Sequence, residues 1–427
     1  MEALEFVRSH YADLRSITGE GNRRLLRAVQ ADFLPDLQLH EVPSGTACLD
    51  WTVPPEWNCR SARLWAPDGS LVVDLARHNL HVLNYSAPFA GELSWTELEP
   101  HLHTLPDQPE LIPYKTSYYR RDWGLCLPHS LKESLRHAGT YRVEIDATLD
   151  DDGSLTYGEW FLPGQTEEEI LLSTHICHPQ LAIDNLSSVA VLAALGRQLD
   201  QAGPQKLGVR ILLVPGTIGP VVWLSRNRRY MTHPPAYAFV LALAGAPGPL
   251  HLKAPPALGS QHNWALALHV AEVTGSPYTS LPYEPYGYDE RQYNTLGPAM
   301  QAVRIGRANY GGYMAYHTSA DDLSLVSGNG MADTLGYMHR LLEVCQATPR
   351  YTSLVRHGEP QYGKHGAFEA ITPLWPDRRA REQAMYWLMS HADDTPLAAL
   401  ALQSGLPLPL LEQVAQALLE LGLLLKR

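Results

Sequence analysis

Residues 171–196, LLSTHICHPQLAIDNLSSVAVLAALG, combine an apolar run, a polar loop and a second apolar run. The first run begins upstream, as EEILLSTHI at 168–176, and has the length and nearly continuous apolar character of a strand buried on both faces. The second run, 186–199, is long enough for a helix. A strand followed by a helix predicts a doubly wound α/β fold with a mostly parallel sheet.

The same alternation continues downstream. GVRILLV at 208–214 and AYAFVLALA at 236–244 are two further patterns of buried strands, and 330–345 predicts a late helix. We therefore expect residues 1–45 and 140–365 to form one α/β domain.

Two other regions differ from this domain in composition and hydrophobic pattern. Residues 46–139 are rich in proline, tryptophan and tyrosine and contain short alternating runs, which predict a small inserted β-rich domain. Residues 371–427 contain three short helical patterns and a final apolar piece, LLLKR, in the order of a winged helix.

The composition excludes several classes of protein. The 427 residues are enough for two or three domains, and a net charge of −12 offers no general attraction to nucleic acid or to an anionic membrane. No run approaches a membrane span, and residues 1–15 lack the apolar core of a signal peptide. The five cysteines are scattered and contain no CxxC pair, which is typical of the reducing cytoplasm.

The candidate site lies in loops that follow strands. Ligands of open parallel sheets bind beyond the carboxyl ends of the strands, and three such loops begin near 177, 215 and 245. Only the first contains obvious ligands, His178 and then Asp184, and His317 offers a second imidazole far downstream. Two imidazoles and a carboxylate suit a zinc ion that keeps one coordination position open.

Other interpretations of these residues stay open. The chain has 19 histidines, and most will be ordinary surface or core residues. His175, two residues before Cys177, is a further candidate ligand, but we expect it to face the other packing layer of the sheet. Cys177 is a soft ligand candidate, although a buried free thiol is the more common state of such a residue.

Long segments of the chain resemble a family of aminopeptidase-like domains of unknown function, whose genes often lie near bacterial genes for polysaccharides or specialised metabolites. Besides 171–196, the resemblance covers these segments: HEVPSGTACLDWTVPPEWN (40–58), NLHVLNYSAPF (79–89), LPDQPELIPYKTSYYRRDWGLCL (105–127), DGSLTYGEWFLPG (152–164), VPGTIG (214–219), YDERQYNTLG (288–297) and YHTSADDL (316–323). It continues into the C-terminal helices and therefore extends over nearly the whole chain.

The resemblance implies a core similar to the di-zinc exopeptidases, interrupted by a small β-domain and followed by a winged helix. It implies that His178 is the first metal ligand, Asp184 the carboxylate that bridges two metals, and His317 the distal ligand. Asp289 and Glu290 then border the active site as acid–base candidates, and Arg291 and Tyr316 are the expected substrate contacts. The alternative is that 289–292 is a solvated charged turn.

Three positions depart from the family pattern. Gly216 stands where relatives carry a glutamate that acts as general base, and Ala246 and Ala315 stand where they tend to carry carboxylates. Thr217 stands where the di-zinc enzymes have a second glutamate. These losses favour one zinc ion over two, and the loss of a general base commonly lowers the rate by a factor of about 10²–10⁴.

Three functions remain open at this point. The first is a zinc-dependent amide hydrolase that acts on a small aminoacyl or short-peptide substrate, with homo-oligomers possible. The second is a non-hydrolytic relative, either a pseudoenzyme or a biosynthetic enzyme that uses the pocket for another reaction. The third, a winged-helix regulator, is disfavoured because the candidate recognition helix has no basic residue and contains Glu412 and Glu420.

Overall fold

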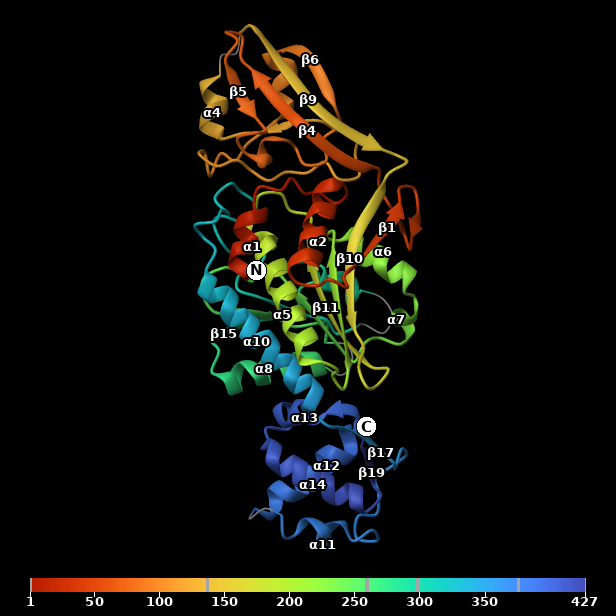
Figure 1. Cartoon of the computed structure of the whole chain (residues 1–427). Coiled ribbons are helices and arrows are strands. Elements are labelled where there is room, and N and C mark those ends of the chain that lie inside the picture. Colours follow the sequence, from red (N-terminus) through yellow and green to blue (C-terminus); the bar gives the residue numbers. More distant parts are fainter. Residues whose placement is uncertain (1, 136–137, 258–260, 296–299, 375–376, 427) are drawn as a thin grey trace.

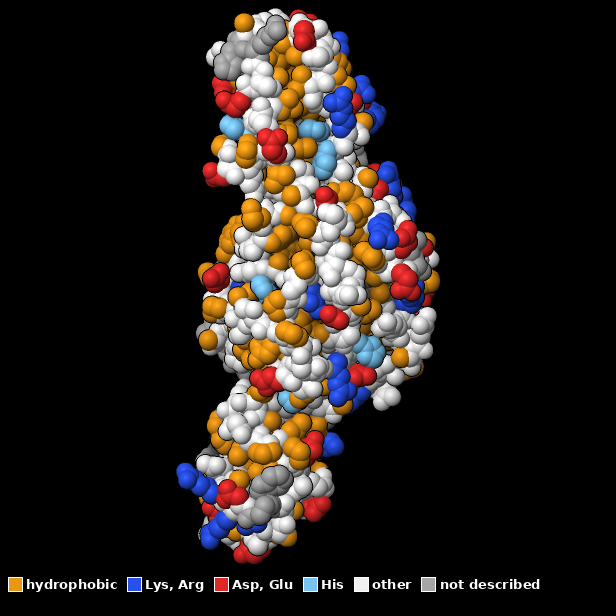
Figure 2. All heavy atoms as spheres, turned by 90° about the vertical axis from the view of Figure 1, so that its left-hand side faces the viewer, with side chains coloured by type: hydrophobic (Ala, Val, Ile, Leu, Met, Phe, Trp, Pro, Cys, Tyr) orange, Lys and Arg blue, Asp and Glu red, His pale blue; other side chains and the backbone are white. Residues whose placement is uncertain are grey.

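The computed structural model of the chain describes residues 2–135, 138–257, 261–295, 300–374 and 377–426. Three parts follow one another along the long axis: a β-rich part, a central part with the largest sheet, and a helical part that contains the C-terminus (Figure 1). The space-filling view shows them as successive lobes, with many hydrophobic side chains exposed on the central one (Figure 2).

The central sheet has eight strands in the order β1-β10-β12-β11-β13-β16-β14-β15. Their bounds are β1 Gln38–Pro43, β10 Ser154–Leu162, β12 Gly208–Val214, β11 Glu169–His175, β13 Tyr237–Leu241, β16 Val303–Gly306, β14 Leu250–Lys253 and β15 Tyr278–Leu281. The four inner strands β12, β11, β13 and β16 are parallel, and β10 and β14 run antiparallel to them on either side. The mixed α/β fold expected from the sequence is therefore confirmed.

All seven residues of β11 are buried, because layers of side chains cover both faces of the sheet. Ile170 and Leu172 point into a core shared with helices, while Leu171, between them, belongs to the core on the opposite face. This arrangement explains the continuous apolar run in the sequence.

Helices cover the two faces of the central sheet. The first core contains side chains of α1 (Ala3–His10), α2 (Glu20–Asp32), α5 (Ser188–Ala202), α8 (His262–Thr274) and α10 (Gly328–Ala347). The second contains side chains of α6 (Ile218–Arg226), α7 (Arg229–Thr232) and α9 (Glu290–Tyr293) together with residues of the β-rich part.

The β-rich part is built on an antiparallel sheet in the order β5-β4-β9-β6. Its strands are β5 Leu71–Asp74, β4 Glu56–Trp65, β9 Thr140–Asp150 and β6 Phe89–Ser94. The short pairs β2 (Ala47–Cys48) with β3 (Trp51–Thr52) and β7 (Leu102–His103) with β8 (Leu125–Cys126), and the helices α3 (Trp95–Leu98) and α4 (His129–Ser134), complete it.

The position of β9 differs from the expected start of the second α/β segment at 140. β9 alternates buried and exposed residues, as a strand with one solvated face does, and it pairs with β4 and β6. After β1, the chain returns to the central sheet only with β10, which follows the turn at 151–153.

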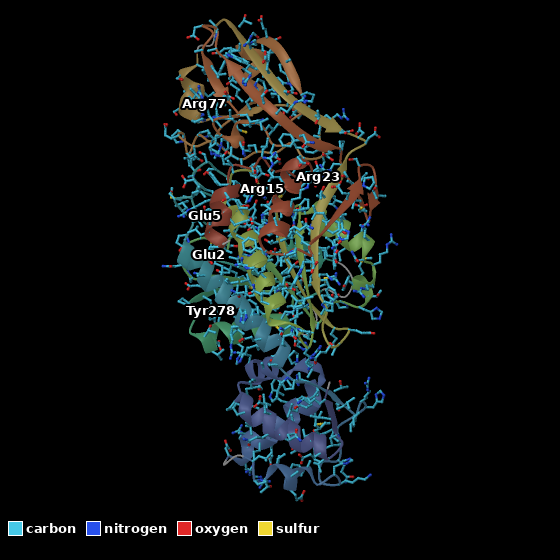
Figure 3. All side chains as sticks on the ribbon, in the orientation of Figure 1. Glu2, Glu5, Arg15, Arg23, Arg77 and Tyr278 are labelled. Atoms are coloured by element: carbon cyan, nitrogen blue, oxygen red, sulfur yellow. The ribbon has the colours of Figure 1, made fainter. Side chains whose placement is uncertain are left out.

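A partly buried arginine connects the β-rich part to the central part. Arg23 of α2 donates to Glu41 of β1 over 2.8 Å and to Glu56 of β4 over 2.7 Å, and its side chain is only 13% exposed. Figure 3 shows Arg15 and Arg23 near the junction of the two parts. One guanidinium thus joins a helix to both sheets.

The helical part contains α11 (Ala367–Ile371), α12 (Arg378–His391), α13 (Leu397–Ser404) and α14 (Leu408–Glu420). Its sheet has the order β18-β17-β19, with β18 Asp393–Pro396, β17 Arg350–Ser353 and β19 Leu424–Lys426. The expected winged helix is present, but its sheet includes β17, which lies before the predicted start at 371. Residues 375–376, within the range predicted for the winged helix, lie outside the described residues.

Side chains at the base of the central part hold the helical part in place. Arg350 pairs with Glu168, and His262 Nε2 lies 3.0 Å from Thr395 Oγ1. α13 packs against α8. Among the described helices, none is long and apolar enough to cross a membrane.

The third helix of the winged helix, α14, has an exposed face without a cation. Its exposed side chains include Glu412, Gln413, Gln416 and Glu420, and α11 packs against another side of the helix. Such a face cannot neutralise phosphates, which supply most of the affinity of non-specific DNA binding.

We therefore predict that the full chain does not bind duplex DNA tightly. A mobility-shift assay at low salt should show no complex at micromolar protein, because α14 presents two carboxylates to the groove. Tight binding that weakens steeply with added salt would contradict this prediction.

Candidate metal centre

The candidate centre lies where β11 ends. His175 is the last residue of β11, and His178 follows in the next loop. Asp184 lies in the irregular helical turn Ala182–Ser187, which leads directly into α5. The carboxylate of Asp184 is fully buried, and His178 Nε2 lies 3.9 Å from its Oδ2.

His317 approaches the same carboxylate from a distant loop. Its Nε2 lies 3.2 Å from Asp184 Oδ2. Neither atom has a hydrogen-bonding partner, although both are shielded from solvent. The three residues predicted as ligands, His178, Asp184 and His317, are thus neighbours, and two of their donor atoms are left unsatisfied.

The expectation that His175 faces the other layer of the sheet is wrong. His175 Nε2 lies 2.9 Å from Asp184 Oδ1, and Asn185 Nδ2 lies 3.2 Å from His175 Nδ1. Alternation along β11 does not continue past its last residue, so the side chains of His175 and His178 converge. The potential ligand atoms of His175, His178 and Asp184 all lie within 4.8 Å of one another.

The histidines stabilise the ionised form of the buried carboxylate. Burial acts to raise the pKa of Asp184, but the nearby His178, the hydrogen bond of His175 and the close approach of His317 outweigh it and hold the pKa well below its usual range. Burial lowers the pKa of His178 well below its usual value, which keeps that imidazole neutral. A carboxylate and a neutral imidazole are the protonation states that metal ligands require.

Asp321 fixes the loop that contains Asp184. Its Oδ1 accepts the backbone N–H of Ile183 over 2.7 Å, and its Oδ2 accepts that of Asp184 over 3.0 Å. Its backbone carbonyl accepts the N–H of Ala182 over 3.1 Å. The backbone N–H groups of three successive residues therefore all donate to Asp321, which lies four positions after His317.

The β-rich part provides one wall of the centre. Tyr114 is buried, and its ring centroid lies 5.0 Å from those of both His178 and His317. Its backbone N–H donates to the carbonyl of His317 over 2.8 Å. On the other side, Arg15 donates through Nε to the carbonyl of His178 over 3.0 Å, which fixes that loop.

The segment 288–291, which leads into α9, approaches the centre through Tyr288, and the structure distinguishes its two acids. Asp289 accepts the N–H of Thr217 through Oδ1 over 2.6 Å, while its Oδ2 is buried without a partner. Burial raises the pKa of Asp289 to about 6. Glu290, in contrast, is paired with Lys253 over 2.9 Å.

Tyrosine rings line the rest of the centre. Tyr316 stacks on His317 with ring centroids 3.9 Å apart, and Tyr288 stacks on His175 at 5.4 Å. Arg291 donates to Thr217 Oγ1 over 3.1 Å. All four remaining predicted site residues, Asp289, Glu290, Arg291 and Tyr316, thus lie on segments around the centre. Leu296 and Gly297, which end the motif quoted above for 288–297, lie outside the described residues.

Gly216, Ala246 and Ala315 are the three positions at which the expected carboxylates are missing. A Cβ atom at Gly216 would lie 3.2 Å from Cys177 Sγ and 3.6 Å from His175 Cβ. Ala246 and Ala315 line a cavity of about 870 Å³ together with Ile183, the neighbour of Asp184. This cavity could not be predicted from the sequence, because its walls come from segments far apart in the chain.

The donor set suits a metal ion. Imidazole nitrogens and a carboxylate oxygen are common zinc ligands, and a bound cation would satisfy the unpartnered Asp184 Oδ2 and His317 Nε2. His178, Asp184 and His317 form one possible ligand set, and His175 either joins them or orients Asp184 by its hydrogen bond.

Family models match almost the entire chain. One, described as a domain of unknown function (DUF4910), matches residues 4–348. A second, described as winged helix-turn-helix, matches residues 350–426, so it includes β17.

Related proteins and structures agree with this assignment. A protein of Clostridium acetobutylicum, named for polysaccharide biosynthesis and an aminopeptidase-like domain, is 35% identical over 424 residues, which cover 99% of this chain and 96% of its own. A crystal structure of a candidate peptidase from Clostridium acetobutylicum has a TM-score of 0.80 and 34% identity, covering 100% of this chain and 96% of that one. BSAP, a zinc aminopeptidase from Bacillus subtilis, has a TM-score of 0.56 at 11% identity, covering 81% of this chain and 95% of its own, and so shares the fold.

We predict that replacing His178 or Asp184 by alanine removes most of the zinc that the purified protein binds. Each substitution deletes one donor atom from a ligand set of three or four, which weakens zinc binding. Elemental analysis after dialysis measures the effect.

His233→Ala is the control, since this histidine is exposed at the end of α7. Zinc content that stays undiminished in both the His178 and the Asp184 variant would contradict the assignment. His175→Ala and His317→Ala, measured in parallel, identify which of these two imidazoles is a ligand.

Proposed function

Because the chain belongs to the DUF4910 family and shares its fold with a zinc aminopeptidase, we propose that it is a zinc-dependent amide hydrolase that acts on a small aminoacyl or peptide substrate. The observation that carries this proposal is the buried Asp184 among three histidines, with Asp184 Oδ2 and His317 Nε2 left without partners. The name of the Clostridium acetobutylicum relative favours a role in a biosynthetic pathway.

One zinc ion, held by His178, Asp184 and His317, would polarise the amide carbonyl and make water a stronger acid. His175 orients the carboxylate of Asp184 through the 2.9 Å hydrogen bond. A second ion is disfavoured, because neither Ala246 nor Ala315 supplies a carboxylate.

Asp289 is the better of the two acid–base candidates. Its Oδ2 has no partner, and its burial raises the pKa to about 6, close to the value that suits a proton acceptor near neutral pH. Glu290 is less suited, since the ammonium of Lys253 already occupies its Oε1. In this proposal Asp289 takes the proton that the glutamate at position 216 takes in relatives.

The surroundings favour a substrate with an apolar group. Ile183 precedes Asp184 in the chain and lines a cavity of about 870 Å³, a volume within the range of small-molecule sites, although none of the proposed metal ligands lines it. Tyr316, stacked on His317, would contact the part of the substrate next to the amide.

A non-hydrolytic reaction is the second candidate. It is favoured by Gly216, whose Cβ position is crowded by Cys177, because a general base cannot be supplied from that strand end without moving the thiol. Zinc-loaded protein that binds aminoacyl amides but hydrolyses none of a broad panel would support this candidate over the first.

We predict that Asp289→Asn lowers kcat by a factor of about 10²–10⁴ on any amide that the protein hydrolyses. The amide side chain keeps an oxygen that can accept the N–H of Thr217 but cannot take up a proton. Steady-state kinetics at saturating zinc, with zinc content measured in the same samples, provide the test.

Asp200→Asn is the matched control, because Asp200 is exposed at the end of α5. If the Asp289 variant retains the wild-type rate with full zinc occupancy, Asp289 is not the proton acceptor.

A further inference from the structure

Arg291 is a cation without an anionic partner at the edge of the candidate centre. Its guanidinium donates to Thr217 Oγ1 over 3.1 Å, and within the described part of the chain it forms no ion pair within 4.0 Å. Arg210, for comparison, is paired with Glu159 and Glu169, whereas the buried Arg15 and Arg304 donate to backbone carbonyls. In the described part of the chain Arg291 donates to neither a carboxylate nor a carbonyl, which leaves its guanidinium available to an acidic ligand.

The atoms around Arg291 are also left unsatisfied. Arg291 Nε is shielded from solvent and has no acceptor. The three residues before it each contain a buried polar atom without a partner, namely Tyr288 OH, Asp289 Oδ2 and Glu290 Oε2. Buried polar groups in native proteins are nearly always hydrogen-bonded. An oxyanion would satisfy the donor Arg291 Nε, whereas the acceptor Asp289 Oδ2 needs a donor such as the N–H of a substrate amide.

Thr217 holds the carboxylate of Asp289 and the guanidinium of Arg291 in fixed positions. Its N–H donates to Asp289, while its hydroxyl oxygen accepts from Arg291. The backbone of Thr217 has a φ of 66°, which is strained for a β-branched residue. Strained backbone is typical of sites where side chains must be presented in one geometry.

One aromatic side chain lies beside the guanidinium. Arg291 Cζ lies 5.8 Å from the ring centroid of Tyr286, whose side chain is 54% exposed. A guanidinium beside a ring still binds anions through the N–H groups at its planar edge.

We propose that Arg291 binds an oxyanion of the substrate, a carboxylate or a phosphate, next to the amide that the centre attacks. This inference rests on the proposed function and specifies its substrate class: an amide with a negative charge on the side that faces Tyr286. A guanidinium matches both oxyanions through parallel N–H bonds, and Asp289 stays within the same turn to act on the amide. Arg291 is therefore a specificity-determining residue.

Binding is measured on protein stripped of metal by a chelator, so that no turnover takes place. Leucylglycine and leucylglycinamide, which differ only in the terminal carboxylate, are titrated by calorimetry, and inorganic phosphate is tested as a competitor. Wild-type protein should bind the carboxylate peptide about tenfold more tightly than the amide, as expected for a charged hydrogen bond. Competition by phosphate together with weak discrimination between the peptides would identify phosphate as the oxyanion.

Arg291→Ala should abolish the preference for the charged probe, and Arg291→Lys should retain part of it, because lysine keeps the charge but not the planar fork. Arg228→Ala, an exposed arginine before α7, is the control and should retain the full preference. Thermal unfolding shows whether each variant is folded. Equal binding of both peptides without competition by phosphate, no binding of any probe at millimolar concentration, or a preference that survives Arg291→Ala would overturn the proposal. None of these outcomes depends on hydrolysis, so they are separate from a failure of the proposed function.

Discussion

The carboxylate of Asp184 has no contact with water, and an ionised carboxylate in that position is costly unless its surroundings compensate the charge. In this protein the compensation comes from imidazoles on both sides: His175 binds Oδ1, and His178 and His317 lie near Oδ2. Because those histidines come from the end of a strand, from its loop and from a distant loop, the buried charge requires all three segments to meet. The fold around the centre depends on that requirement.

Asp321 transmits this constraint to the backbone. The carboxylate of Asp184 can hold a metal ion only if its position is fixed. The backbone N–H groups of Ala182, Ile183 and Asp184 all donate to Asp321, which fixes that position. Since Asp321 shares a loop with His317, the two sides of the centre are connected without passing through the sheet. Tyr114 adds a third connection, because its N–H is bonded to the carbonyl of His317. The β-rich part is thus a structural component of the centre as well as an insertion.

The sequence predicted the features that depend on local pattern. The continuous apolar run of β11 identified a buried strand, and the residues at its end, His178 and Asp184, are neighbours in the structure. His175 was misplaced because side-chain alternation applies only within a strand, and the chain turns immediately after it. The boundary at 140 was misplaced because a strand pattern does not reveal which of two sheets the strand joins. Asp289 and Glu290 differ in their partners, which are Thr217 and Lys253 respectively. Both partners lie far away in the sequence, so the local pattern could not predict them.

The contact between Gly216 and Cys177 couples the two positions. The thiol accepts the N–H of Gly216 over 3.2 Å, and a Cβ atom at 216 would lie 3.2 Å from the same sulfur. Substitutions at residues in contact do not add independently, so the effect of a new side chain at 216 depends on which residue stands at 177. A larger residue at 216 is therefore accommodated more easily when a smaller residue replaces Cys177, and the two positions are best varied together.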